Sequence, residues 1–214
     1  MSQLHVDTVL KSFGDKQVLT DVYLTCSIGE IIGLVGRNGC GKSTLLKIVF
    51  GSLSADNKFI KVGNSIINGL HHNLIKYLPQ SHFLPNHIKI KTIINLFCSN
   101  EGAIKISENP LVKPLLNKNS GQLSGGEKRI VEILLIIYSE AKYILIDEPF
   151  NGVSPIFREE IKKLIVENSK TKGFIVTDHD YRNVLKIATR TVVMHDGGIK
   201  EVKTTDDLVR WGYI

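Results

Sequence analysis

Residues 36–44 combine glycines, one lysine and two hydroxyl side chains in the spacing of a phosphate-binding loop. The segment GRNGCGKST follows the apolar run EIIGLV and precedes the helix-like run TLLKIV. The glycines allow consecutive backbone N–H groups to point inward at phosphate oxygens, and the helix that follows adds its positive end. The residues expected to bind a nucleotide are Gly36, Arg37, Asn38, Gly39, Cys40, Gly41, Lys42, Ser43 and Thr44.

Three side chains of this loop have specific chemistry. Lys42 can reach the outer phosphates and is a candidate catalytic residue, and the Ser43 hydroxyl is placed to coordinate Mg²⁺. Cys40 fits as a small residue, although its position beside Lys42 and a helix N-terminus could also make the thiol reactive. A glycine-rich turn without a ligand is the alternative, and the flanking strand and helix argue against it.

The segment YILIDEP is an apolar strand that ends in two adjacent acids, Asp147 and Glu148. Ligands of open α/β sheets bind at the carboxyl ends of strands. Asp147 is therefore a candidate for the Mg²⁺ shell. Glu148, whose side chain points elsewhere, can orient or deprotonate an attacking water. In isolation the pair would equally suit a solvated turn, so this assignment depends on the phosphate-binding loop.

A second glycine-rich segment, LSGGEKR, directly precedes the amphipathic run IVEILLIIYSE. A glycine pair costs backbone entropy in a regular element, which suggests that the backbone must approach something closely. We expect bare N–H groups at a helix N-terminus formed by Ser124, Gly125 and Gly126, and hence a second anion site. This segment has no lysine and no metal ligand to hold a phosphate alone.

These motifs need a scaffold that brings strand ends together. Alternating β-branched residues predict two half-buried strands near the N-terminus, and 59–69 suggests a hairpin around Gly63-Asn64. EIIGLV reads as a strand buried on both faces of a parallel sheet. From 126 onward, helices and strands alternate, with the last strand at 189–202, which indicates a mostly parallel sheet covered by helices.

Between these parts the pattern changes. Residues 87–97 and 110–118 are short helical candidates, and no strand stands out among them. We therefore predict one domain, 1–214, of α/β class: a mostly parallel core sheet, an N-terminal antiparallel β-subdomain and a short inserted helical subdomain at about 81–138.

Bulk composition narrows the class of protein. The chain has 214 residues, three cysteines without metal-type spacing, and a formal charge of +6. No apolar run approaches the roughly 20 residues that a membrane helix needs, so we expect no direct membrane insertion. We expect a reducing, cytoplasmic location, because the N-terminus lacks the layout of a signal peptide. The charge alone permits nucleic acid, anionic lipid or nucleotide as a partner, or only scattered surface charge.

Taken in order, the motifs resemble those of the ATP-binding cassette (ABC) ATPases over nearly the whole chain. They are the phosphate-binding loop, LPQ, LSGGE, IDEP and TDH, together with an aromatic residue in KSFG. LSGGE is diagnostic of this family among P-loop enzymes. The longer runs LSGGEKRIVEI and DEPFNGVSPI are similar to the subgroup of the lipopolysaccharide-export and branched-chain amino-acid transporter ATPases.

The resemblance implies roles for individual residues. Gln80 would sense Mg²⁺ and the attacking water, His179 would contact the γ-phosphate, and Phe13 would stack on adenine. The residues Ser124, Gly125 and Gly126 would contact the ATP bound by a second chain. The resemblance also implies Mg²⁺ and ATP as cofactors, a homodimer or a dimer with a paralogous ATPase subunit, and an integral membrane permease as partner. The location would be peripheral, at the inner face of the cell membrane, with nucleic acid an unlikely partner.

Three departures from the family pattern bear on function. Ser154 stands where an aspartate is usual, so the coupling between two sites across a dimer could be weaker. Phe13 replaces the more common tyrosine, and the helical insertion is short. The expected function is an ATP-hydrolysing transporter subunit. The alternatives are a soluble ABC-type ATPase with a non-transport partner, such as a scaffold or nucleic acid, and an idle nucleotide-gated binding module.

Overall fold

Four strands within residues 3–66 form an antiparallel sheet. In the computed structural model, which describes residues 3–70 and 73–213, this sheet has the strand order β2-β1-β4-β5. Both predicted N-terminal strands and the hairpin around Gly63-Asn64 are present. Thr8 has a φ of 48° where the β1 register shifts, which marks a bulge in the long strand. The strands are β1 (Gln3–Phe13), β2 (Lys16–Ser27), β4 (Asn57–Val62) and β5 (Ser65–Ile66).

A second sheet of six strands forms the centre of the molecule, in the order β10-β9-β3-β8-β7-β6. All its neighbouring strands are parallel except β10 and β9. The continuous apolar runs of β3, β7 and β8 are buried at every position, as such runs in a parallel sheet should be. The strands are β3 (Ile31–Val35), β6 (Ile75–Leu78), β7 (Tyr143–Asp147), β8 (Gly173–Thr177), β9 (Arg190–His195) and β10 (Gly198–Val202).

The prediction of one strand over 189–202 is wrong, because the chain reverses direction within this segment. Asp196 and Gly197 both have positive φ, 47° and 72°, and connect β9 to β10 as an antiparallel hairpin. An Asp-Gly pair between apolar runs is a strong signal for a two-residue turn of this kind. The reversal places an antiparallel strand at the edge of the parallel sheet.

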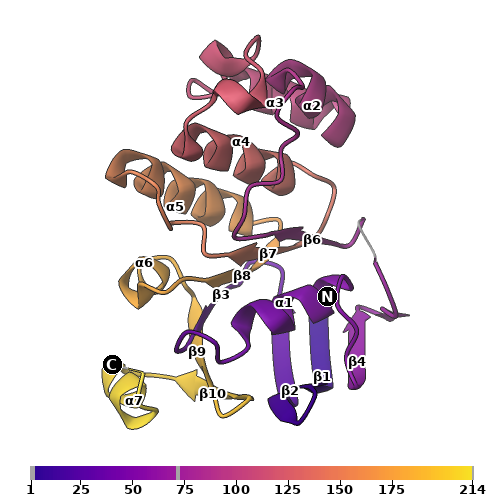
Figure 1. The fold of residues 1–214 in the computed structure, drawn as a ribbon, viewed down its shortest axis with the longest axis vertical. Helices are drawn as coiled ribbons and strands as arrows, with labels where there is room; N and C mark the ends of the chain where they lie inside the picture. Colours follow the sequence, from indigo (N-terminus) through magenta and orange to yellow (C-terminus); the bar gives the residue numbers. More distant parts are fainter. Residues whose placement is uncertain (1–2, 71–72, 214) are drawn as a thin grey trace.

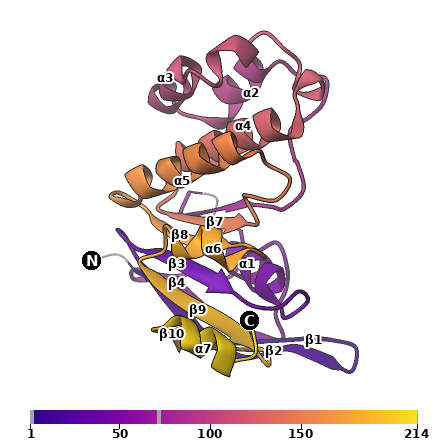
Figure 2. The same ribbon diagram turned by 90° about the vertical axis from the view of Figure 1, so that its left-hand side faces the viewer.

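Helices cover both faces of the central sheet (Figure 1). Helix α1 (Lys42–Phe50) lies between the two sheets and packs into one apolar core with both of them. Helices α4 (Gly125–Ile137) and α5 (Pro155–Ser169) cover the opposite face and form the other large core. Shorter helices α6 (Tyr181–Leu185) and α7 (Thr205–Arg210) pack near β3, β9 and β10. Figure 2 shows the same layers from the side.

The region predicted as a helical insertion is mostly helical. It contains α2 (Ile90–Phe97), α3 (Asn100–Glu108), two 3₁₀ turns at Lys113–Leu115 and Ser120–Gln122, and α4. The helix expected over 110–118 is reduced to the first of these 3₁₀ turns, which contains a proline in its first positions. Helix α3, capped by the Ser99 side chain, was not expected, and neither was α7. The division of the chain at 81–138 stays a prediction.

Helix α4 is the most deeply buried helix of this region. Every residue from Arg129 to Ile137 is buried, including the charged side chains of Arg129 and Glu132. Each buried aliphatic side chain stabilises the fold by roughly 1.5–3 kcal/mol before conformational entropy is subtracted. Across the part of the chain that the structure describes, helices of the length and apolarity that a bilayer crossing needs are absent.

Candidate functional site

The phosphate-binding loop connects β3 to α1 with a backbone that only glycine adopts easily. Gly36, Gly39 and Gly41 have φ values of 153°, 77° and 111°. A Cβ atom at Gly36 would lie 2.8 Å from the main-chain oxygen of Met194, so this position also lacks room for a side chain. The sequence expectation that these glycines serve the loop's shape agrees with this geometry.

The Lys42 ammonium is held inside the loop. Its Nζ donates to the main-chain oxygens of Gly36 and Arg37, at 2.6 and 3.1 Å, and the side chain is 5% exposed. Helix α1 begins at the same residue, after Gly41, which has no side chain to cap it. The positive end of α1 and the ammonium therefore face the same space, which favours an anion there.

Asp147 ends strand β7 and is almost completely buried. Its Oδ1 accepts a hydrogen bond from Thr177 Oγ1 at 2.7 Å, and its Oδ2 accepts one from Tyr77 Oη at 2.9 Å. Thr177 is the last residue of β8, the strand next to β7. The carboxylate is thus held from both sides by neutral hydroxyl groups.

Glu148 follows directly and has a strained backbone. Its φ of 48° lies in the left-handed region, where a non-glycine residue costs of order 1–3 kcal/mol. The Glu148 N–H donates to the main-chain oxygen of Thr177 at 3.1 Å. The side chain accepts a hydrogen bond of 2.7 Å from Gln80 Nε2. The strain turns this carboxylate away from Asp147 and toward the loop after β6, in agreement with the expected division of roles.

His179 lies in the loop after β8, and its side chain is half exposed. Its Nδ1 is 3.4 Å from Oδ1 of Asp178, a fully buried carboxyl whose pKa is raised by burial. Asp178 also accepts hydrogen bonds from the N–H groups of Asp180 and Phe150. The main-chain oxygen of His179 accepts a hydrogen bond from Tyr213 Oη at 3.1 Å. The loop is therefore fixed while the imidazole stays accessible.

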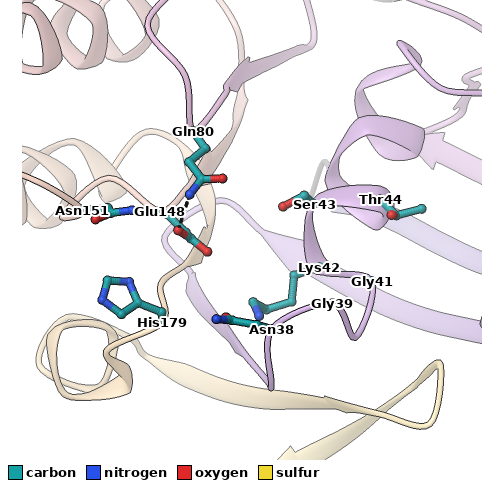
Figure 3. Close-up of a pocket in the computed structure, with 10 residues that line it drawn as sticks. All are labelled: Asn38, Gly39, Gly41, Lys42, Ser43, Thr44, Gln80, Glu148, Asn151 and His179. Atoms are coloured by element: carbon teal, nitrogen blue, oxygen red, sulfur yellow. Dashed lines mark hydrogen bonds between the residues drawn. The ribbon is translucent and has the colours of Figure 1, made fainter.

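These elements surround one cavity of about 490 Å³ at the carboxyl edge of the central sheet (Figure 3). Nine residues predicted from sequence line it, and Asn151 is a tenth that the prediction missed. Asn151 could have been noticed as a polar residue in the loop that follows a strand end. The lining residues are Asn38, Gly39, Gly41, Lys42, Ser43, Thr44, Gln80, Glu148, Asn151 and His179.

Other predicted residues lie outside the lining of this cavity. Asp147 is buried at the end of β7, and Gly36 packs against Cys40 of its own loop and Met194 of β9. Arg37 and Cys40 line a separate cavity of about 150 Å³ beside Trp211 and Tyr213. Phe13 is 50% exposed near the end of β1, with Lys11 Nζ 5.0 Å from its ring centre.

The LSGGE segment starts α4, away from the cavity lining. The expectation of a bare N–H at Ser124 is wrong, because that N–H donates to Glu127 Oε2 at 2.7 Å. In return, Ser124 Oγ accepts the Glu127 N–H at 3.3 Å, which completes a capping box. The hydrogen bond from the Ser124 N–H lowers the pKa of the Glu127 carboxyl. Behind the helix start, a Cβ at Gly126 would lie 2.8 Å from the Phe157 ring, whereas one at Gly125 would meet only His82, at 3.7 Å.

A buried ion pair on α4, missed in the sequence, connects this helix to the cavity. The Arg129 guanidinium, 2% exposed, donates to the main-chain oxygens of Pro79, Asp147 and Glu148 at 2.7, 2.8 and 3.3 Å. It also lies 3.6 Å from Glu132, which is fully buried and accepts the Phe83 N–H. One cation thus joins α4 to the loops that hold Gln80 and Glu148.

The oxygen ligands around the cavity suit Mg²⁺. Ser43 and Gln80 line it, and Asp147, the residue before Glu148, supplies a buried carboxylate. Within residues 3–70 and 73–213, no cluster of three or more His, Cys, Asp or Glu side chains forms a separate metal centre. This donor set fits Mg²⁺, which is commonly bound by one or two protein ligands together with waters and phosphate oxygens.

Comparisons with known proteins agree with this geometry. A protein-family model described as "ABC transporter" matches residues 19–151. The lipopolysaccharide export system ATP-binding protein LptB of Haemophilus influenzae is 32% identical, over 98% of this chain and 93% of that protein. LptB of Escherichia coli K12 is also 32% identical, over 92% and 88%. An aliphatic sulfonates import ATP-binding protein, SsuB of Albidiferax ferrireducens, is 28% identical, over 88% and 69%.

Solved structures share the fold. The ATP-binding subunit of an ABC transporter superposes with a TM-score of 0.85 at 23% identity, covering 98% of this chain and 93% of that one. A nucleotide-free ATP-binding cassette superposes with a TM-score of 0.82 at 23% identity, covering 98% and 96%. The predicted fold, with a mostly parallel core sheet and an N-terminal antiparallel sheet, is confirmed.

Proposed function

Because the chain belongs to the ABC transporter family, we propose that it is an ATP-binding subunit that hydrolyses ATP to power a separate membrane permease. The observation that supports this most is the single cavity that gathers Lys42, Gln80, Glu148 and His179 from four separate segments. The relatives reported above are transporter subunits, and no feature of the cavity favours a non-transport partner.

Hydrolysis needs phosphate binding and an activated water. The loop amides, the positive end of α1 and the Lys42 ammonium bind the phosphates and stabilise the charge that develops on them. Glu148 acts as the general base, and Gln80, bonded to it at 2.7 Å, orients it toward the attacking water. His179, accessible across the cavity, contacts the γ-phosphate.

The residues that would hold Mg²⁺ are Ser43, Asp147 and Gln80. Ser43 and Gln80 line the cavity, and Asp147 supplies the negative charge. When bound, Mg²⁺ would neutralise part of the phosphate charge. The Gln80 amide nitrogen bonds Glu148, so its oxygen stays available to the metal or to the water.

The LSGGE segment supports a working unit of two chains. Ser124, Gly125 and Gly126 begin a helix outside the lining of the chain's own cavity. In the proposed dimer, this helix start contacts the ATP bound by the second chain, and Phe13 stacks on the adenine of its own ATP. Ser154, the N-cap residue of α5, lies exposed after Asn151 and would face the dimer contact without the usual carboxylate.

The permease determines what is moved. The relatives named above include both an export and an import system, so neither direction nor cargo follows from the cavity. The exposed surface of α2 and α3 is the proposed contact for the permease, at the inner face of the membrane.

The decisive experiment replaces Glu148 with glutamine. Glu148→Gln should bind ATP like the unmodified chain but release phosphate about 10²–10⁴ times more slowly, because the general base is lost. It should also accumulate as an ATP-bound dimer, measured by light scattering with size-exclusion chromatography. Glu167→Gln, an exposed glutamate on α5, is the matched control and should leave turnover unchanged. Undiminished phosphate release from Glu148→Gln would refute the assigned role.

A further inference from the structure

Tyr77 connects three parts of the site without lining the cavity. It lies in strand β6, three residues before Gln80, and its hydroxyl donates to Oδ2 of Asp147 at 2.9 Å. Its ring is tilted against Phe50, with the ring centres 5.7 Å apart. Phe50 is the last residue of α1, the helix that begins at Lys42. One side chain therefore joins the end of the phosphate-binding helix to the acidic end of β7.

The partners of the Asp147 carboxylate are unusual for a buried charge. The residue is 2% exposed, and a buried carboxylate is usually paired with a cation. Here each oxygen accepts from a neutral hydroxyl, Tyr77 on one side and Thr177 on the other. Within the described residues no ion pair to this carboxylate is found, since the nearby Arg129 donates to the main-chain oxygen of Asp147 instead.

Neutral donors orient a carboxylate without cancelling its charge. A lysine or arginine in the place of Tyr77 would fix the carboxylate equally well but would repel an incoming cation. Two hydroxyl groups add no positive charge beside the carboxylate, and each carboxylate oxygen accepts only one of these hydrogen bonds and has a second lone pair. Hydrogen-bonded partners of this kind tune metal ligands and commonly change metal affinity when they are removed.

We propose that Tyr77 is a positioning residue that holds the Asp147 carboxylate, together with Thr177, in the orientation that binds the metal of the nucleotide complex. This inference rests on the proposed ATPase function. The contact with Phe50 helps to keep the ring in place.

Tyr77→Phe tests the hydroxyl alone, because the ring and its contact with Phe50 are kept. The purified chain is saturated with ADP and titrated with Mn²⁺, which takes the same oxygen ligands as Mg²⁺, and free Mn²⁺ is measured by electron paramagnetic resonance. ADP affinity is measured separately in EDTA. We expect the Mn²⁺ dissociation constant to rise about tenfold, while ADP affinity in EDTA changes by less than about twofold.

Further variants make the test specific. Tyr23→Phe removes a hydroxyl from an exposed tyrosine on β2 and should leave both affinities unchanged. Thr177→Val removes the other donor and should also weaken Mn²⁺ binding, which keeps the test open if Tyr77→Phe does not fold. In an Asp147→Asn background, Tyr77→Phe should have no additional effect on Mn²⁺, because its action passes through that carboxylate.

The two measurements distinguish a failure of the Tyr77 positioning role from a failure of the proposed ATPase function. Unchanged Mn²⁺ affinity in Tyr77→Phe, or an equal loss of ADP affinity in EDTA, would overturn the positioning role while the nucleotide site stands. If the unmodified chain does not bind ADP in EDTA, the proposed function fails, and the inference fails with it.

Discussion

Removing the buried cation of α4 should destabilise the whole chain. Arg129→Met keeps most of the aliphatic volume but leaves three main-chain oxygens without their donor, those of Pro79, Asp147 and Glu148. It also leaves the fully buried Glu132 without the cation that lies 3.6 Å away. Burial lowers the pKa of Arg129, while the charges of Glu132 and Asp147 oppose that shift.

The expected magnitude follows from these contacts. A hydrogen bond to a charged group contributes about 1.5–3 kcal/mol, and removing one partner of a buried ion pair costs about 3–5 kcal/mol. These values overlap, because the same guanidinium makes all the contacts. We therefore expect the free energy of unfolding to fall by about 4 kcal/mol, a large part of the 5–15 kcal/mol typical of a domain.

Urea unfolding followed by circular dichroism measures this loss. With a slope of about 2 kcal/mol per M, the midpoint should fall by about 2 M. Arg158→Met is the matched control, since Arg158 Nε makes one hydrogen bond of 2.7 Å to the main-chain oxygen of Val153. That variant should lose about 1.5 kcal/mol, the lower end of the range for a charged hydrogen bond, because this one is only partly buried. Adding Glu132→Gln to Arg129→Met should recover part of the loss, because without Arg129 the buried Glu132 charge has, among the described residues, only His82 Nδ1, 2.9 Å away on a partly exposed ring, as an ion-pair partner.

Equal losses in Arg129→Met and Arg158→Met would refute the reasoning. So would a double variant that is less stable than Arg129→Met, because the Glu132 charge left without Arg129 would then not be a source of the instability.

Two further predictions concern nucleotide binding and the start of α4. Lys42→Ala should weaken ATP binding at least about tenfold, or about 1.4 kcal/mol, because the ammonium inside the loop is lost. The dissociation constant is measured by calorimetry, and an unchanged value would contradict the assignment of this segment as a phosphate-binding loop. Gly125→Asp should abolish hydrolysis while each chain still folds and binds ATP, since a Cβ there meets only His82 at 3.7 Å; wild-type phosphate release would contradict it. Gly126→Asp should in addition lower the melting temperature, because its Cβ would collide with Phe157, and equal melting temperatures for the two variants would contradict that difference.

Much of the fold could be predicted because its signals are local. The buried runs of β3, β7 and β8, the glycine loop before α1 and the amphipathic α4 each show in a short window of sequence. Two features that the sequence analysis missed also have local signals. The Asp196-Gly197 turn and the capping box that starts at Ser124 both have recognisable short motifs.

Some residues of the candidate site likewise have a local sequence signal, and others do not. Lys42, Asp147 and Glu148 could be chosen as candidates because the residues next to them in the chain form recognisable motifs, and of the three Lys42 and Glu148 line the cavity. Asn151 was missed because only its place in the loop after β7 brings it to the cavity. Phe13 was expected at the nucleotide from resemblance, and it lies outside the cavity lining.

The sequence by itself determined the chemistry available at each strand end, because loop shape, strand burial and helix starts follow from neighbouring residues. Only the tertiary structure decided which distant groups hold that chemistry in place. Tyr77 and Thr177 reach the Asp147 carboxylate across three adjacent strands, and Arg129 reaches three main-chain oxygens from a helix packed over the sheet. Such contacts have no fixed spacing along the chain, since they depend on how strands order themselves in the sheet and on which helix covers them.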